Sequence, residues 1–240
     1  MYKRQAVNGN SHNNVAWCWK AGNETVEDAS GTINVTRSTN VDAGFSIISW
    51  NGTGVAGTIP HGLGKNVEFL WHKNRESGNA QYNWHKSLTA GKGVYFNFTD
   101  GETTESTNLI TDNGDGNNLA VSTGNGANQS GSNIICYAWT GIEGYSKFGS
   151  YKGNANNPDN AFVYTGFKPA LVITKKFSST SSWAMWDNKR NPNNPVDTVV
   201  LASGDGAEST ESATYGIDFV ANGFKSHTTS SVSYTHLRAH

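Results

Sequence analysis

Short runs rich in Val, Ile, Phe, Tyr and Trp recur along the chain, and clusters of Gly, Asn and Asp separate them. Runs of about four to eight such residues between turn-forming residues are typical of antiparallel β-strands. No segment shows the period of about 3.6 residues that marks an amphipathic helix. We therefore predict strands at Gly44–Trp50, Val67–Lys73, Gln81–His85, Val94–Phe98, Leu119–Thr123 and Ile134–Trp139.

The segments between these runs carry residue pairs that suit tight hairpins. A glycine after Asn or Asp supplies the left-handed backbone that a two-residue hairpin turn requires. Such pairs occur at Asn51-Gly52, Asp100-Gly101, Asn113-Gly114, Asn125-Gly126 and Asn222-Gly223. The regular spacing of strands and turns predicts an all-β fold of antiparallel β-sandwiches, jelly-roll-like in form, with a barrel as the alternative.

The second half of the chain resembles the first half, with matching segments in the same order. Ser49–Gly52 matches Ser150–Gly153, which lies 101 residues later. Gln81–His85 matches Trp183–Asp187, which lies 102 residues later. A period of about 100 residues is much longer than that of a solenoid, so each repeat is expected to be a small domain with its own core. The sequence therefore predicts tandem β-sandwich repeats, one complete and two partial.

Both ends of the chain look artificial. Residues 1–5 and residues 232–240 resemble translations of the two strands of one transposase adapter used in sequencing. A match of the two ends to the two strands of one adapter is more specific than a match at one end alone. We therefore expect that neither end is natural sequence. Segments of this kind carry no information about the natural fold.

The sequence between these ends is expected to be a piece of a longer repeat protein. Residues 6–42 are predicted to hold the last strand of a preceding repeat, at Val15–Lys20, followed by a linker. Residues 43–140 would then form the complete repeat. Residues 141–231 would form a second repeat that lacks its final strand.

Charge and composition exclude several classes of partner. Charged residues make up 15% of the chain, the formal net charge is −1, and no run of Lys and Arg is long enough to follow a phosphate backbone. No stretch approaches the roughly 18 to 20 apolar residues needed to cross a bilayer. We therefore expect neither nucleic acid nor a membrane as a partner. Cys18 and Cys136 lie in apolar runs, where a cysteine typically acts as a small buried hydrophobe.

Asp112, Asp115 and Asn117 are candidate metal ligands. They lie in an oxygen-rich loop with interspersed glycines, and a hard cation such as Ca²⁺ needs several carboxylate and carbonyl oxygens on a sharply turning chain. Their spacing fits no EF-hand, and the second repeat has no comparable loop. A plain hairpin turn with solvated carboxylates is therefore the favoured interpretation.

No catalytic motif is present. The sequence lacks a Gly-x-Ser-x-Gly elbow, a Walker loop and a His-Glu-x-x-His helix. His61, His72 and His85 would form a transition-metal cluster only if the fold brought them together, and their matching positions in the second repeat are not His. We therefore predict that the chain is not an enzyme and carries no cofactor.

Trp71 and its neighbour His72 are the candidates for ligand binding. An exposed Trp can stack on the face of a sugar, whereas most of the other Trp residues fall on strands where a core role is favoured. Trp84 and Trp186 occupy matching positions of the two repeats, as core residues would. Trp71 has no aromatic counterpart, because Thr174 is aligned with it. Trp71 is therefore the better candidate for a surface that binds glycans.

Several segments carry a resemblance to a known family, and the resemblance covers nearly all of residues 6–231. They are Val15–Gly22, Gly44–Gly54, His61–Gly64, Glu143–Asn154, Phe162–Ala170, Arg190–Pro192 and Ile217–Phe224. They resemble a repeated domain of unknown function found in phage virion and tail proteins, common in marine phages. Lys65-Asn66 departs from the usual pattern of that family, which has little bearing on the fold. The resemblance provides no catalytic or binding residues to transfer.

The resemblance implies a structural or adhesive repeat of a phage virion surface or tail-fibre protein, located on the virion and outside the cell. Its partners would be other virion proteins or further copies of the same chain, as in a homotrimer, and a glycan on the host surface. The alternative is a carbohydrate-binding module of a bacterial polysaccharide-degrading enzyme, which would also explain the Trp content. Coat and tail genes beside the reading frame favour the first function, and a glycosidase domain on the same chain favours the second.

Overall fold

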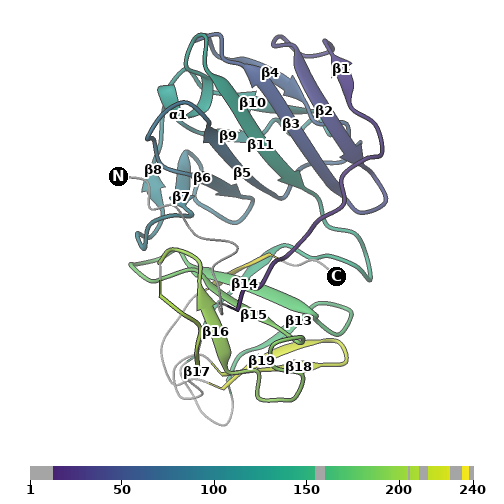
Figure 1. Ribbon diagram of the computed structural model, residues 1–240, viewed down its shortest axis with the longest axis vertical. Helices are drawn as coiled ribbons and strands as arrows, with labels where there is room; N and C mark the ends of the chain where they lie inside the picture. Colours follow the sequence, from purple (N-terminus) through teal and green to yellow (C-terminus); the bar gives the residue numbers. More distant parts are fainter. Residues whose placement is uncertain (1–12, 155–159, 205, 211–215, 228–233, 238–240) are drawn as a thin grey trace.

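The computed structural model describes residues 13–154, 160–204, 206–210, 216–227 and 234–237. Antiparallel strands form two lobes, which lie one above the other in Figure 1. We call residues 26–139 the upper lobe and residues 149–237 the lower lobe. The helix found in the described ranges, α1 (Asn125–Asn128), has four residues. None of the described residues forms a helix long and apolar enough to span a membrane. The predicted all-β fold is confirmed.

Two sheets pack against each other in the upper lobe. The large sheet has eight strands in the order β1-β2-β3-β11-β5-β6-β7-β8, and the small sheet has three in the order β4-β10-β9. The strands are β1 (Val26–Asp28), β2 (Val35–Asn40), β3 (Phe45–Asn51), β4 (Gly57–Pro60), β5 (Phe69–Asn74), β6 (Tyr82–His85), β7 (Lys92–Tyr95), β8 (Thr103–Thr104), β9 (Ile110–Asp112), β10 (Asn118–Val121) and β11 (Asn133–Trp139).

The lower lobe is a second pair of sheets. Its large sheet has six strands in the order β12-β20-β14-β15-β16-β17, and its small sheet has the order β13-β19-β18. The strands are β12 (Gly149–Tyr151), β13 (Phe162–Tyr164), β14 (Leu171–Lys176), β15 (Ala184–Asp187), β16 (Thr198–Leu201), β17 (Ser209–Thr210), β18 (Ile217–Val220), β19 (Gly223–Ser226) and β20 (Tyr234–Leu237).

Five of the six strands predicted from apolar runs are present as β3, β5, β6, β10 and β11, whereas the run at Val94–Phe98 overlaps β7 only at its first two residues. The segment before them differs from the prediction. Residues 15–20, expected to be a strand, have no regular structure. Strands β1 and β2 lie instead in the stretch expected to be a linker, and they continue the large sheet beyond β3. This stretch is therefore part of the sheet of the upper lobe.

The turn expected at Asn125-Gly126 is also different, because both residues lie in α1. Tertiary contacts hold this short helix in place. The side-chain oxygen of Asn128 accepts hydrogen bonds from the indole of Trp50 at 3.2 Å and from the backbone of Thr53 at 3.0 Å. Among the glycines of the predicted turns, Gly114 has a left-handed backbone, with φ of 78°. The prediction of a glycine-dependent hairpin holds at that turn, between β9 and β10.

Strands β3 to β11 and strands β12 to β20 have the same spatial order when they are matched along the chain. The registers of their central hairpins also agree. Phe69 pairs with His85 in the upper lobe, and Leu171 pairs with Asp187, each 102 positions later, in the lower lobe. The tandem repeat stays a prediction from the sequence, and the structure adds that the two halves match in strand order and in register.

This register corrects one detail of the sequence alignment. Thr174 was aligned with Trp71, but the strand pairing places Ile173 at the position of Trp71 and Thr174 at the position of His72. A slip of one residue moves a side chain to the other face of a sheet. Trp71 therefore has an aliphatic counterpart on the same face of the lower-lobe sheet.

The lower lobe has a closing strand where the sequence predicted none. Strand β20 lies between β12 and β14, as β11 lies between β3 and β5. It consists of residues from the tail expected to derive from an adapter. Ladder hydrogen bonds come from the backbone and so do not depend on side-chain identity, which explains how such a tail can occupy this position.

The two faces of the large sheet in the upper lobe belong to different clusters. The inner face packs against the small sheet and contributes residues such as Ile48 and Leu70 to the core of the upper lobe. The outer face contributes Phe45, Phe69 and Trp139 to a second cluster, which also contains residues of the lower lobe. Successive side chains of a strand point to opposite faces, which explains this separation.

The lower lobe is built in the same way. Val172 and Trp186 point inward to its own core, whereas Leu171, Ile173 and Met185 point to the cluster shared with the upper lobe. Figure 1 shows β14 and β15 on the side of the lower lobe nearest the upper lobe, and β18 and β19 on the far side. The outer faces of the two large sheets therefore meet across one shared apolar cluster.

Candidate functional site

A cavity of about 560 Å³ lies where the two lobes meet. We call it the aromatic cleft. The upper lobe lines it with Phe45 from β3, Phe69 and Trp71 from β5, and Tyr137 and Trp139 from β11. Because every second residue of a strand faces the same side, three neighbouring strands place these rings on one surface.

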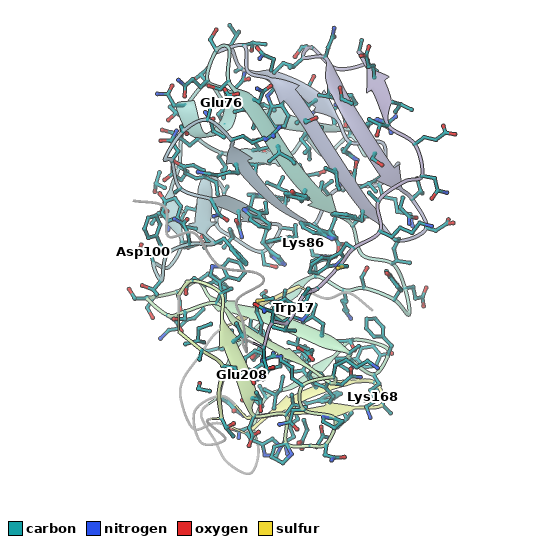
Figure 2. The ribbon with its side chains drawn as sticks, in the orientation of Figure 1. Trp17, Glu76, Lys86, Asp100, Lys168 and Glu208 are labelled. Atoms are coloured by element: carbon teal, nitrogen blue, oxygen red, sulfur yellow. The ribbon has the colours of Figure 1, made fainter. Side chains whose placement is uncertain are left out.

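The lower lobe and the N-terminal segment complete the aromatic cleft. Ile173 and Met185 come from the outer face of the lower large sheet, and Trp183 precedes β15. Trp17 and Trp19 come from the segment before β1, and Figure 2 shows Trp17 between the two lobes. The residues predicted to form a strand at 15–20 therefore lie across the junction of the lobes and add two indole rings to it.

Trp71 lies in this cluster and is half-buried. Its ring stacks with Phe96 at a centroid distance of 4.9 Å and contacts Tyr137 at 5.4 Å. A flat aromatic platform for a sugar needs an exposed ring face with hydroxyl-binding groups beside it. The described residues that line the aromatic cleft are aromatic and aliphatic residues, one methionine and two glycines, so Trp71 has few polar side chains beside it to bind the hydroxyls of a sugar.

Several indole groups of this cluster lack a hydrogen-bond acceptor. The buried Nε1 atoms of Trp17, Trp19, Trp71 and Trp139 have no partner within the described part of the chain. Trp183 differs, because its indole N–H donates to the carbonyl oxygen of Tyr95 at 2.7 Å. A buried donor without a partner costs about 1–3 kcal/mol. The hydrogen bonding of this cluster is therefore less complete than that of an ordinary protein core.

His72 does not share a site with Trp71, because it lies on the inner face of the sheet. Its imidazole is fully buried and stacks on the ring of Tyr82 at 5.3 Å. Burial lowers the pKa of His72 from 6.5 to about 3, since the charged form would be cut off from water. His72 is therefore a neutral core residue at physiological pH.

His61, His72 and His85 do not form a cluster. His72 pairs with Tyr82 and His85 with Phe69, so the two histidines are three register positions apart and point to opposite faces. His61 follows β4, and its Nδ1 accepts a hydrogen bond from the backbone of Leu63 at 3.2 Å. No group of three or more His, Cys, Asp or Glu side chains that could hold a metal ion occurs among the described residues.

The loop of Asp112, Asp115 and Asn117 is a tight hairpin between β9 and β10. One carboxylate oxygen of Asp115 accepts from the backbone of Asn117 at 2.8 Å and of Asn118 at 2.7 Å, and the other accepts from the side chain of Asn118 at 2.9 Å. These bonds hold the pKa of Asp115 well below its usual range. The carboxylate of Asp112 accepts from the backbone of Val67 at 2.8 Å. Asp112 also accepts from the backbone of Gly114 at 3.0 Å, so both carboxylates accept hydrogen bonds within the turn and Asp112 links the turn to Val67.

A second cavity, of about 460 Å³, lies at another part of the junction between the lobes. We call it the polar cleft. Glu68 and Lys86 line it from the upper lobe, where the ammonium of Lys86 lies 2.7 Å from the carboxylate of Glu68. Figure 2 places Lys86 at the edge of the upper lobe that faces the lower lobe. Lys147 and Tyr164 line it from the other side.

Tyr164 is the feature of the polar cleft that the sequence analysis missed. Its side chain is 59% exposed, and Phe162 on the same face of β13 is 50% exposed. The Lys147 ammonium lies 5.1 Å from the centroid of the Tyr164 ring. The alternation of Phe162, Val163 and Tyr164 was the available signal, because Val163 packs inward against the lower core and thereby turns its two neighbours outward.

A buried lysine links the two lobes near the aromatic cleft. The Lys175 ammonium donates to the carbonyl oxygens of Thr99 at 3.1 Å, Ser181 at 2.8 Å and Lys176 at 2.8 Å. Burial lowers the pKa of Lys175 to about 8. Thr99 belongs to the upper lobe, so this side chain ties the two lobes together as well as the loop between β14 and β15.

The two cysteines differ in exposure, although both were expected to be buried. Cys18 is exposed, Cys136 is buried, and the two are not joined by a disulfide in the structure described. Burial raises the pKa of the Cys136 thiol, which keeps it protonated and unreactive. Cys136 lies on the inner face of β11, in the core of the upper lobe.

The comparisons with known proteins identify a family. A family model described as a domain of unknown function, DUF7483, matches residues 1–236. No curated protein and no solved structure matches the chain. The match covers nearly the whole sequence, both lobes included. The chain therefore belongs to the family of the domain of unknown function DUF7483.

Proposed function

We propose that the chain is a structural and adhesive unit of a virion surface protein, such as a phage tail fibre, and acts outside the cell. The observation that carries this proposal is the junction of the lobes: two sandwiches share one apolar cluster, and an exposed aromatic ring lies in a polar cleft at the same junction. A virion surface needs stiff units that resist shear, and an adhesive unit also needs an accessible contact site.

Several contacts across the junction support stiffness. The backbone of Glu102 donates to the carbonyl of Phe177 at 2.7 Å, and the backbone of Ser181 donates to the carbonyl of Thr99 at 2.7 Å. With the bonds of Lys175 and the shared apolar cluster, these contacts limit hinge motion between the lobes. Lobes that move freely normally meet through smaller and more polar surfaces.

The polar cleft is the part of the molecule that best suits a host glycan. The exposed ring of Tyr164 offers a face on which a sugar can stack. Glu143, Lys147 and Thr165 supply groups that can bind hydroxyls around it. The glycan contact that the sequence analysis placed at Trp71 is therefore proposed at Tyr164 instead. Partners of the remaining surface would be other virion proteins or further copies of this chain.

Glycan-array binding of the intact chain tests the adhesive part. We expect Tyr164→Ala to weaken binding at least tenfold, because it removes the stacking face. Val55→Ala, which trims another exposed apolar side chain, in the upper lobe, should leave binding unchanged. Loss of binding in Trp71→Ala with full binding in Tyr164→Ala would contradict the placement at Tyr164. Absence of binding to every glycan would reduce the proposal to a stiff spacer.

A carbohydrate-binding module of a bacterial polysaccharide-degrading enzyme is the second candidate, and the same ring of Tyr164 favours it. The array result alone does not separate the two, since both bind sugars. Peptides of this chain in purified virions would support the first function, and a glycosidase domain on the parent chain would support the second.

A further inference from the structure

The aromatic cleft has the size of a small-molecule site. Its volume of about 560 Å³ lies within the range of roughly 300–1,000 Å³ that is usual for ligand pockets, which often occur where two domains meet. Buried Phe45, Phe69 and Trp139 form its floor, and half-buried Trp71 and Tyr137 form part of its wall. The exposed Gly204 and Gly206 of its lining lie at the edge that opens to solvent.

The described residues that line the aromatic cleft carry no carboxylate, ammonium, guanidinium or imidazole group. A charged ligand would lose its hydration there without gaining a partner, so it would bind poorly. A sugar would lose the hydrogen bonds that its hydroxyls donate, because Tyr137 has the one side-chain oxygen among the described lining residues. An uncharged molecule with an apolar body loses little on leaving water and gains contact with many aromatic rings.

One residue that lines the cleft from the lower lobe is much smaller than its counterpart in the upper lobe. Val94 pairs with Asn83 in the upper lobe and Val200 with Met185 in the lower lobe, so the strand registers match Phe96 with Ala202, two positions further along. Phe96 fills space against Trp71 in the upper lobe. Ala202 fills none of the corresponding space, which leaves the cavity open on the side of the lower lobe.

The hydrogen-bond pattern is a second, independent observation. The indole N–H groups of Trp17, Trp19, Trp71 and Trp139 have no acceptor within the described residues. A core that was complete without a ligand would not leave so many donors unpaired in one cluster. These nitrogens are covered by neighbouring atoms, so an ether, ester or carbonyl oxygen of a bound molecule would accept from them once the rings rotate toward it.

We infer that the aromatic cleft binds an uncharged apolar small molecule, with a body the size of an acyl chain or of linked aromatic rings. This site is separate from the polar cleft and does not depend on the proposed contact with a glycan. It would give the unit a second binding activity that the sequence analysis did not anticipate.

Titration of the intact chain with N-phenyl-1-naphthylamine tests the inference, because this uncharged probe becomes fluorescent in apolar surroundings. We expect saturable binding with energy transfer from tryptophan. The anionic analogue 8-anilino-1-naphthalenesulfonate should bind at least tenfold more weakly, since no cation lines the cleft. Failure of the uncharged probe to bind, or equal binding of the two probes, would overturn the inference.

The matched variant is Ala202→Phe, which places in the lower lobe the ring that the upper lobe has at Phe96. It should fill the cleft and weaken binding of the uncharged probe at least tenfold, while Tyr164→Ala in the polar cleft should bind it normally. Unchanged binding in a folded Ala202→Phe protein would show that the probe binds elsewhere and would overturn the inference. If that variant does not fold, Trp71→Ile removes one wall ring instead, and undiminished binding then has the same meaning.

Discussion

The two lobes share a strand order and a hairpin register, but they bury different residues at matched positions. On the inner face the upper lobe pairs His72 with Tyr82, and the lower lobe pairs Thr174 with Ala184. The upper lobe thus fills its core with two stacked rings, an imidazole and a phenol. The lower lobe fills the matched space with small side chains and relies on the buried ring of Trp186 nearby.

The outer faces differ as well. Trp71 pairs with Asn83 in the upper lobe, and Ile173 pairs with Met185 in the lower lobe. Asn83 is fully buried, and neither atom of its amide group has a hydrogen-bond partner among the described residues. Aliphatic side chains leave no such unpaired groups. The difference teaches that the backbone framework determines the face on which a residue lies. The residue type then determines the free energy of burying that face and the groups with which it can interact.

The edges of the two large sheets are also unequal. In the upper lobe β2 and β1 continue the sheet beyond β3, whereas β12 lies at the edge of the lower sheet in the described ranges. Strand β12 has three residues, and short edge strands limit pairing with other chains. The lower lobe, being smaller, depends more on the junction with the upper lobe for burial of its apolar surface.

The largest effect on stability is expected from Trp183→Ala, which would weaken the contact between the lower lobe and the upper lobe. Trp183 is buried, contacts Phe96 at 5.4 Å and donates to the carbonyl of Tyr95, all across the junction. Truncation of a buried Trp costs about 3–5 kcal/mol. Differential scanning calorimetry should then show the lower lobe unfolding first, in a separate transition. One transition with an unchanged midpoint would contradict the dependence of the lower lobe on this contact.

A smaller effect on stability is expected when the pH is lowered, because of the titration of His72. Its pKa in the folded protein is about 3, below the 6.5 of an exposed histidine. Below pH 6.5 the unfolded chain therefore binds a proton at this histidine, whereas the folded chain does not. The free energy of unfolding should therefore fall by about 1.4 kcal/mol for each pH unit between about pH 6 and pH 4 because of this residue. The loss ends near the folded pKa.

His72→Thr places the residue of the lower lobe in the upper lobe and should remove this contribution to the pH dependence. Urea unfolding at several pH values measures the slope for both proteins. His61, whose pKa burial lowers to about 4, remains in both and contributes equally. Equal slopes for the two proteins would show that His72 becomes protonated without unfolding of the upper lobe.

The smallest effect is expected from Asn83→Met, which gives the upper lobe the outer-face residue of the lower lobe. Removal of a buried amide without partners should raise the free energy of unfolding by about 1 kcal/mol. The reciprocal variant Met185→Asn should lower it by a similar or larger amount. Urea unfolding measures both. A loss of stability in Asn83→Met would show that the amide has a structural role that the longer side chain cannot replace.

The positions of most strands could be predicted from the sequence, because apolar runs between turn residues are a local signal. Strands β3, β5 and β11 have strong runs of this kind. Val35–Asn40 was missed, because Thr, Arg, Ser and Asn follow its single Val and the strand is recognisable only by its pairing with β3. Val15–Lys20 was predicted as a strand from its composition, but it has no partner in the described sheets and lies across the junction instead.

The candidate site was predictable only in part. Trp71 was singled out as a surface-binding candidate, but it is half-buried among Phe96 and Tyr137 of its own lobe and residues of the other lobe, about a hundred residues away in sequence. Its grouping with His72 was avoidable, because adjacent residues of a strand point to opposite faces. Tyr164 was missed for a different reason. The alternation along β13 places Phe162 and Tyr164 on one face, but the exposure of that face depends on where β13 lies in the small sheet, beside β19.

The sequence by itself determined the class of the fold, the strands that carry the apolar runs, and the alternation that separates an inner from an outer face. These depend on local geometry, since side chains alternate along every strand whatever surrounds it. The tertiary structure alone decided that the outer faces of the two lobes meet, that Ala202 leaves a cavity opposite Trp71, and that Tyr164 stays exposed beside Lys147. Those features come from contacts between residues far apart along the chain.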